Sequence, residues 1–120
     1  MPLTGLSILV VEDDYLIALD AEQMLRGAGA TEVVISTRAD FPETLASRKF
    51  DIALVDTGVD GSHVAEDLAL ARKAGVRIAF TTSDITLVAG LAGYDGVRFI
   101  DKPYNDQYLQ ALAELVRSRS

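Results

Sequence analysis

Short runs of apolar residues recur along the chain, and several of them are continuous rather than alternating in polarity. β-branched residues, which favour extended backbone, are frequent in these runs. A continuous apolar run is typical of a strand in a parallel sheet, because both faces of such a sheet are covered. The pattern predicts five strands, within residues 7–11, 32–36, 52–55, 78–81 and 97–100.

Between these runs the apolar residues follow a helical period. Three helix faces consist of Ile17, Ala21, Met24, Leu25 and Ala28, then Val64, Leu68 and Ala71, and then Leu109, Leu112, Ala113 and Val116. Gly29 and Gly75 follow the first two faces, as glycines often do at helix ends. Residues 41–47 predict a shorter helix, whereas the glycines in and after residues 85–92 leave that segment ambiguous.

Strands that alternate with helices predict an α/β fold, a parallel sheet with helices on both faces. Right-handed crossovers then fix the handedness of the connections. In such a fold, ligands bind beyond the carboxyl ends of the strands. Candidate chemistry is therefore expected in the residues that follow each strand.

Length and charge narrow the function classes. A chain of 120 residues suits one domain, and no linker-like stretch divides it. Its net charge of −7 argues against nucleic acid as a direct partner but permits a cation or a basic protein surface. The absence of Cys excludes disulfides and thiolate metal sites. No signal peptide and no apolar run of about 20 residues is visible, so we expect a cytoplasmic protein.

The predicted strand ends carry carboxylates, a hydroxyl group and a lysine. Residues 12–14 are Glu-Asp-Asp, residues 56–58 are Asp-Thr-Gly, residues 81–84 are Thr-Thr-Ser-Asp, and residues 101–103 are Asp-Lys-Pro. Clustered carboxylates repel one another unless a cation offsets their charge, and oxygen ligands suit Mg²⁺. A lysine and a hydroxyl group opposite them suit a phosphoryl group. The set therefore favours phosphoryl transfer to a carboxylate.

Four motifs together resemble the receiver domain of bacterial two-component response regulators. They are residues 8–14 (Ile-Leu-Val-Val-Glu-Asp-Asp), 51–56 (Asp-Ile-Ala-Leu-Val-Asp), 80–83 (Phe-Thr-Thr-Ser) and 99–104 (Phe-Ile-Asp-Lys-Pro-Tyr). The resemblance spans about residues 6–117, so it implies a single receiver domain in residues 1–120 without an output domain. It also implies a flavodoxin-like, doubly wound (βα)5 sandwich with strand order 2-1-3-4-5.

The resemblance assigns roles in phosphoryl transfer and switching. Asp56 looks like the aspartate that accepts the phosphoryl group from a histidine kinase. Lys102 looks like the lysine that pairs with that group, and Thr82 like the hydroxyl residue that moves toward it. Phe99 stands at the aromatic switch position, although it lacks the hydroxyl group of the tyrosine that is common there.

The resemblance also implies a Mg²⁺ site. Glu12 and Asp13 look like the acid pair that holds the metal ion, together with the Asp56 carboxylate and the backbone carbonyl of Gly58. Family members commonly carry a proline in the loop after the phosphoacceptor, whereas residues 57–63 contain none. This departure leaves phosphorylation intact but puts the usual route of switching in doubt.

The implied partners are proteins. The phosphodonor would be a histidine kinase or a histidine phosphotransfer domain. The output would be a downstream protein or a second copy of the chain, bound through the last two β-α units. The chain would not be an enzyme in its own right, since it accepts the phosphoryl group on its own aspartate. The first predicted helix resembles receivers that include those of hybrid histidine kinases.

Three alternatives to a phosphorylated receiver can be weighed. A degenerate receiver would bind partners without being phosphorylated. The Asp-Thr-Gly string at residues 56–58 also matches dimeric aspartic proteases, in which Asp56 would be half of a catalytic dyad, but that fold is nearly all β. A haloacid-dehalogenase-type phosphatase needs an Asp-x-Asp motif that this string does not provide.

Overall fold

The computed structural model describes residues 2–58, 61–82, 98–101 and 106–117. The strands are β1 (Ser7–Val11), β2 (Glu32–Ser36), β3 (Ile52–Asp56), β4 (Arg77–Thr82) and β5 (Arg98–Asp101), and the helices are α1 (Tyr15–Gly27), α2 (Phe41–Ser47), α3 (Val64–Ala74) and α4 (Asp106–Arg117). Within these residues the strands form one parallel sheet in the order β2-β1-β3-β4-β5. The predicted α/β fold class and strand order are confirmed, and every predicted strand agrees to within one residue at either end.

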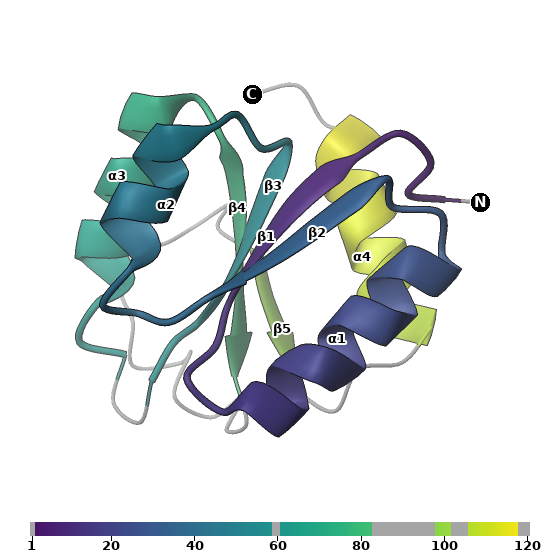
Figure 1. Ribbon diagram of the computed structural model, residues 1–120, viewed down its shortest axis with the longest axis horizontal. Coiled ribbons are helices and arrows are strands. Elements are labelled where there is room, and N and C mark those ends of the chain that lie inside the picture. Colours follow the sequence, from purple (N-terminus) through teal and green to yellow (C-terminus); the bar gives the residue numbers. More distant parts are fainter. Residues whose placement is uncertain (1, 59–60, 83–97, 102–105, 118–120) are drawn as a thin grey trace.

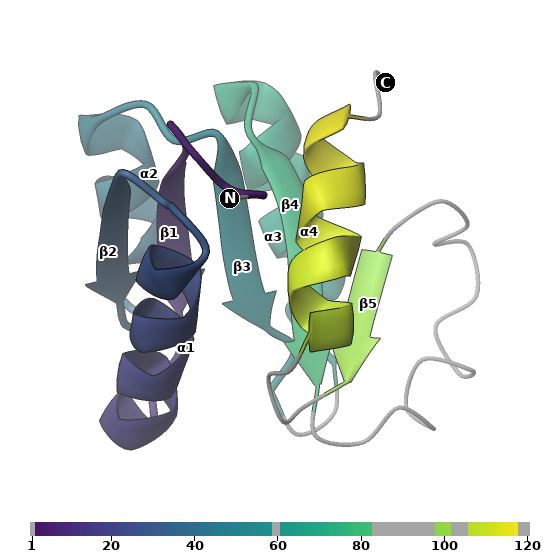
Figure 2. The same cartoon turned by 90° about the vertical axis from the view of Figure 1, so that its right-hand side faces the viewer.

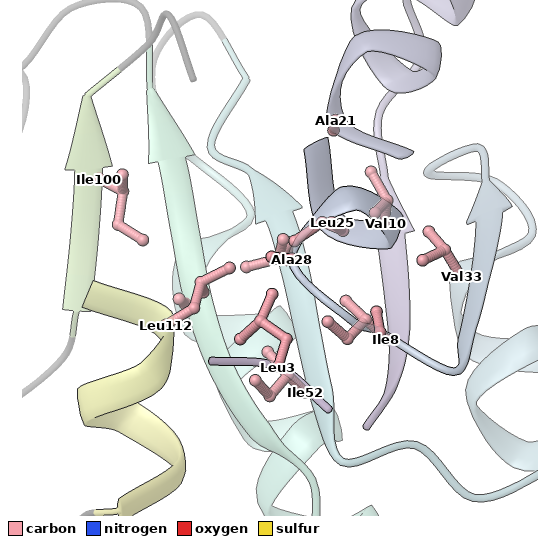
Figure 3. Packing of buried hydrophobic residues seen from close by; sticks show 13 residues of the cluster. Leu3, Ile8, Val10, Ala21, Leu25, Ala28, Val33, Ile52, Ile100 and Leu112 are labelled. Atoms are coloured by element: carbon pink, nitrogen blue, oxygen red, sulfur yellow. The ribbon is translucent and has the colours of Figure 1, made fainter. Parts of the chain in front are cut away.

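The helices cover the two faces of the sheet in pairs, with α1 and α4 on one face and α2 and α3 on the other (Figures 1 and 2). Alternate residues of β1 enter opposite cores. Ile8 and Val10 belong to the cluster that includes residues of α1 and α4, part of which Figure 3 shows. Leu9 and Val11 belong to the cluster that includes residues of α2 and α3. This double burial explains why the strand sequences are continuously apolar.

Two predicted helices end as their glycines indicate. In α1, the amide of Gly29 donates to the carbonyl of Arg26 and the amide of Ala30 donates to that of Leu25, at 3.0 and 3.1 Å. This pair of bonds is a Schellman motif, and Gly29 has the positive φ (104°) that the motif requires. Gly75 ends α3 in the left-handed conformation in the same way. The short helix at residues 41–47 is confirmed, and so are the helix faces, except that the side chain of Val116 lies outside what the structure describes.

The observed architecture contradicts the aspartic-protease alternative, because four helices and a parallel sheet within the described residues are incompatible with a nearly all-β fold. Residues 85–92, whose helical character was ambiguous, lie outside the described residues. Across the part of the chain that is described, none of the helices is both long enough and apolar enough to pass through a bilayer.

We predict that the core on the α1 and α4 face contributes strongly to stability. Leu54 on β3 is 1% exposed, so Leu54→Ala should lower the free energy of unfolding by about 2–5 kcal/mol. Leu16 on α1 is 73% exposed, and Leu16→Ala should change it by less than about 0.5 kcal/mol. Urea denaturation followed by circular dichroism measures both values. Equal losses in the two variants would contradict the assigned core.

Candidate functional site

The three consecutive acids that follow β1 have three different surroundings. Asp14 caps α1, because its Oδ1 accepts hydrogen bonds from the amides of Leu16 and Ile17, at 3.0 and 3.3 Å. Glu12 is buried, and its Oε2 accepts from the amide of Asp14 at 3.3 Å. Asp13 is exposed, and its Oδ1 accepts from the backbone amide of Arg38 at 2.8 Å. Asp14 is therefore the N-cap of α1, whereas Glu12 and Asp13 make other contacts and do not cap the helix.

The end of β3 places a carboxylate beside a tight turn. Oδ2 of Asp56 accepts a hydrogen bond from the amide of Gly58 at 3.3 Å. Gly58 has a φ of 77°, in the left-handed region that favours glycine. The carbonyl of Gly58 accepts from the hydroxyl group of Thr57 at 3.1 Å, and a carbonyl oxygen has a second lone pair. A carboxylate and a carbonyl oxygen are therefore close together in sequence and both are held in place.

Strand register brings most of the predicted site residues to one edge of the sheet. Val11 pairs with Val55, so Glu12 follows β1 at the level of Asp56, and Asp13 comes one residue later. Asp56 pairs with Thr81, which places the buried Thr82 just beyond it on the neighbouring strand. All strands end at the same edge of the sheet (Figure 2). This edge is the one where doubly wound folds bind ligands.

Lys102 follows the last residue of β5 in sequence, and Thr82 pairs with that residue, Asp101. Lys102 itself lies outside the described residues, and so does Ser83. The same holds for most of the surface predicted to bind partners, in residues 83–97 and 102–105. The roles predicted for these positions stay predictions.

The acids present fit a Mg²⁺ site that has only two carboxylate ligands. Among the described residues, no three Asp, Glu, His or Cys side chains form a group that could hold a metal ion. Mg²⁺, however, usually keeps several waters and takes only one or two carboxylates. The Asp13 and Asp56 carboxylates and the Gly58 carbonyl, at or just after the ends of neighbouring strands, are donor types that Mg²⁺ accepts. The buried Glu12 stands directly before Asp13 and adds negative charge.

Surrounding charge favours a cation at this edge. A hollow of about 500 Å³ adjoins Glu12 and Asp13. It is lined by Glu12, Asp13, Tyr15, Glu22, Ile35, Ser36, Thr37, Asp40 and Thr44, four of which are acids and none of which is a base. Clefts lined by charge of one sign concentrate ions of the opposite sign. The hollow therefore presents mainly negative charge beside Asp13, although Glu22 is paired with Arg26 at 3.3 Å.

Phe99 packs in the core that includes residues of α2 and α3. It pairs in register with Phe80 on β4, and the two rings stack with centroids 5.4 Å apart and planes 22° apart. Phe80 is fully buried, whereas Phe99 is only partly buried. The structure thus gives Phe99 a packing role, and its predicted switch role stays a prediction.

An ion pair that was not foreseen from the sequence lies beside Asp13 and Asp56. Arg38, in the loop after β2, reaches the carboxylate of Asp67 on α3, with Nη1 donating to Oδ1 at 3.0 Å. Its Nη2 donates to the backbone carbonyl of Asp56 at 2.9 Å. Asp67 stands among the apolar residues of the α3 face, between Val64 and Ala71. An acid within an apolar helix face needs a buried partner. The position of Asp67 on that face is the sequence feature from which the ion pair could have been predicted.

We predict that the side-chain cap of Asp14 stabilises the fold. Asp14→Ala removes a side chain that accepts two amide hydrogen bonds and should lower the free energy of unfolding by about 1 kcal/mol. Asp40 precedes α2 without a side-chain cap bond, so Asp40→Ala should cost clearly less. Urea denaturation of both variants tests the difference. A cost for Asp40→Ala that equals the cost for Asp14→Ala would contradict the capping role.

Comparisons with known proteins identify the fold. No protein-family model matches the chain, and no curated protein does. Among solved structures, a response regulator receiver protein from Sinorhizobium medicae is 24% identical, with a TM-score of 0.76 over 96% of this chain and 97% of that one. The PhyR response regulator receiver domain of Erythrobacter litoralis is 19% identical, with a TM-score of 0.76 over 100% of this chain and 98% of that one.

A longer protein shares the same fold in part. A mutant of the anti-anti-sigma factor PhyR from Bartonella quintana is 19% identical, with a TM-score of 0.73 over 95% of this chain. The chain spans about half of that protein, 49% of its length. Likeness at these identities establishes architecture, and function depends on the site. The chain has the fold of response regulator receiver domains.

Proposed function

We propose that this chain is a phosphoacceptor receiver of a two-component phosphorelay. Asp56 takes a phosphoryl group from a histidine kinase or a histidine phosphotransfer domain. The observation that carries the proposal is the placement of Glu12 and Asp13 after β1, next to Asp56 at the end of the adjacent strand β3. The receiver fold and the four sequence motifs support it.

The chemistry proposed for Asp56 is an in-line displacement. A carboxylate oxygen forms a bond to phosphorus while the bond from phosphorus to the donor's histidine nitrogen breaks, and that nitrogen keeps the electron pair. The hydrogen bond from the Gly58 amide to Oδ2 holds the carboxylate in position. Positioning and charge neutralisation are what a protein contributes to such a transfer.

Mg²⁺ is the proposed cofactor. The Asp13 and Asp56 carboxylates and the Gly58 carbonyl would hold it, with Glu12 completing the acid pair. When bound, it would offset the negative charge that the phosphoryl oxygens bring to a cluster of carboxylates. The acid-lined hollow beside Asp13 would favour its entry.

The switch is assigned to Thr82 and Lys102. Thr82 is buried at the end of β4, on the strand next to Asp56, where its hydroxyl group would donate to a phosphoryl oxygen. Lys102, directly after β5, would pair with the same group. These two interactions exist only in the phosphorylated state, so they would bias the conformation of the last two β-α units.

The proposed output is protein binding in the cytoplasm. The net charge of −7 disfavours nucleic acid as a partner. One structural neighbour is the anti-anti-sigma factor PhyR from Bartonella quintana, whose name denotes action on another protein. We therefore assign the output to a downstream protein or to a second copy of the chain. The same phosphoryl transfer to Asp56 would take place if the chain were the receiver domain of a hybrid histidine kinase.

Phosphorylation of Asp56 is directly measurable by intact mass after incubation with acetyl phosphate. The wild-type protein should gain one phosphoryl group with Mg²⁺ present and none with the metal chelated. Asp56→Asn should gain none, because the nucleophilic carboxylate is gone. Asp20→Asn, which changes an exposed acid on α1, is the matched control and should label like the wild type.

Two results would count against the proposal. A wild-type protein that stays unlabelled with Mg²⁺ present would leave a receiver that binds partners without being phosphorylated. Labelling of Asp56→Asn at the wild-type rate would move the phosphoacceptor to another residue.

A further inference from the structure

Arg38 connects three segments that surround the candidate site. Its backbone amide donates to Oδ1 of Asp13 at 2.8 Å, and its Nη2 donates to the carbonyl of Asp56 at 2.9 Å. Its Nη1 donates to Oδ1 of Asp67 at 3.0 Å, and Nη2 lies 2.9 Å from Oδ2 of the same carboxylate. One residue therefore contacts a proposed metal ligand, the backbone of the proposed phosphoacceptor and a helix behind them.

These contacts run across three strands of the sheet. Arg38 follows β2, and β2 and β3 are separated by β1 in the sheet. The backbone amide of Arg38 already lies beside Asp13, which follows β1, and its side chain reaches from there to the end of β3. The contacts therefore couple the loops after β1 and β2 to the end of β3, which carries Asp56.

Burial gives these contacts a fixed geometry. Asp67 is 2% exposed and the Arg38 side chain is 24% exposed, so solvent competes little for either group. The planar guanidinium group directs its donors at two acceptors from separate segments, which a flexible point charge such as lysine does not do. Asp67 also neutralises Arg38, so the pair adds little net charge to the acid cluster. Its effect on the site is thus one of position rather than of charge.

We propose that Arg38 is a positioning residue for the Mg²⁺ site, and that Asp67 anchors it. By holding its own loop against the end of β3, it keeps the amide that orients the Asp13 carboxylate in place. By donating to the Asp56 carbonyl, it fixes the backbone orientation at the end of β3, and with it the positions of the Asp56 carboxylate and the Gly58 carbonyl. This inference rests on the proposed function, and it names the residues that set metal affinity without touching the metal.

The test replaces the ion pair without leaving a buried charge. The double variant Arg38→Met with Asp67→Leu removes both charges and keeps similar volumes, a change that often preserves stability. Titration with MgCl₂, followed by amide chemical shifts in NMR spectra, should show about a tenfold weaker Mg²⁺ affinity, as is usual when a residue that orients a metal ligand is lost. The urea midpoint should stay close to that of the wild-type protein.

A second ion pair provides the matched control. Arg48 and Glu32 form a surface bridge of 2.8 Å, and hydrogen bonds from Arg48 and Ser7 lower the pKa of Glu32 below its ordinary value. Arg48 is the C-cap residue of α2 and Glu32 is the first residue of β2, so the pair lies away from the carboxyl ends of the strands. Arg48→Gln with Glu32→Gln should leave Mg²⁺ affinity unchanged.

Arg38→Lys separates geometry from charge and does not depend on the double variant being folded. It keeps the positive charge beside Asp67 but lacks the planar fork, so Mg²⁺ affinity should remain below that of the wild type. Wild-type affinity in Arg38→Lys, or in a folded double variant, would overturn the positioning role while leaving the proposed function intact. A wild-type protein that binds no Mg²⁺ would contradict both proposals.

Discussion

Burial of the central strands on both faces is the constraint on which the rest of the structure depends. Residues 8–11 of β1 and 52–55 of β3 are all buried, with alternate side chains in opposite cores. No polar group can enter these segments without losing its water, which is costly when no partner replaces it. Polar chemistry therefore begins abruptly where each strand ends, at Glu12 and at Asp56. Parallel pairing then brings these abrupt transitions to one edge of the sheet.

The same constraint explains why the edge needs support from behind. Several acids at one edge repel one another, and loops alone hold their side chains loosely. Contacts with the backbone hold these groups in place. Backbone amides donate to the Asp13 and Asp56 carboxylates, and the Arg38 guanidinium group donates to the Asp56 carbonyl. Asp67 in turn holds Arg38 from α3. Rigid support of this kind keeps a site organised before its ligands arrive.

The sequence predicts the strands well because double burial leaves an uninterrupted apolar signal, and it predicts α1 and α3 because their apolar faces are followed by Gly29 and Gly75. It predicts the acids of the site from their places after the strands. It does not predict the contact between Arg38 and Asp67, which are 29 residues apart and meet only in the folded chain. The helix cap at Asp14 follows from an acid placed just before the first helix, and the structure confirms it. The contact between Asp13 and the amide of Arg38 joins distant segments and is not predicted.

We propose that Asp13, Asp56 and the Gly58 carbonyl form a Mg²⁺ site at which Asp56 receives a phosphoryl group. A crystal structure of the chain with Mg²⁺ and beryllofluoride, a phosphoryl mimic, would test this proposal. We expect beryllium bonded to a carboxylate oxygen of Asp56 and a metal ion held by those three groups. Crystals grown under the same conditions with an unmodified Asp56 and no metal beside Asp13 would contradict it.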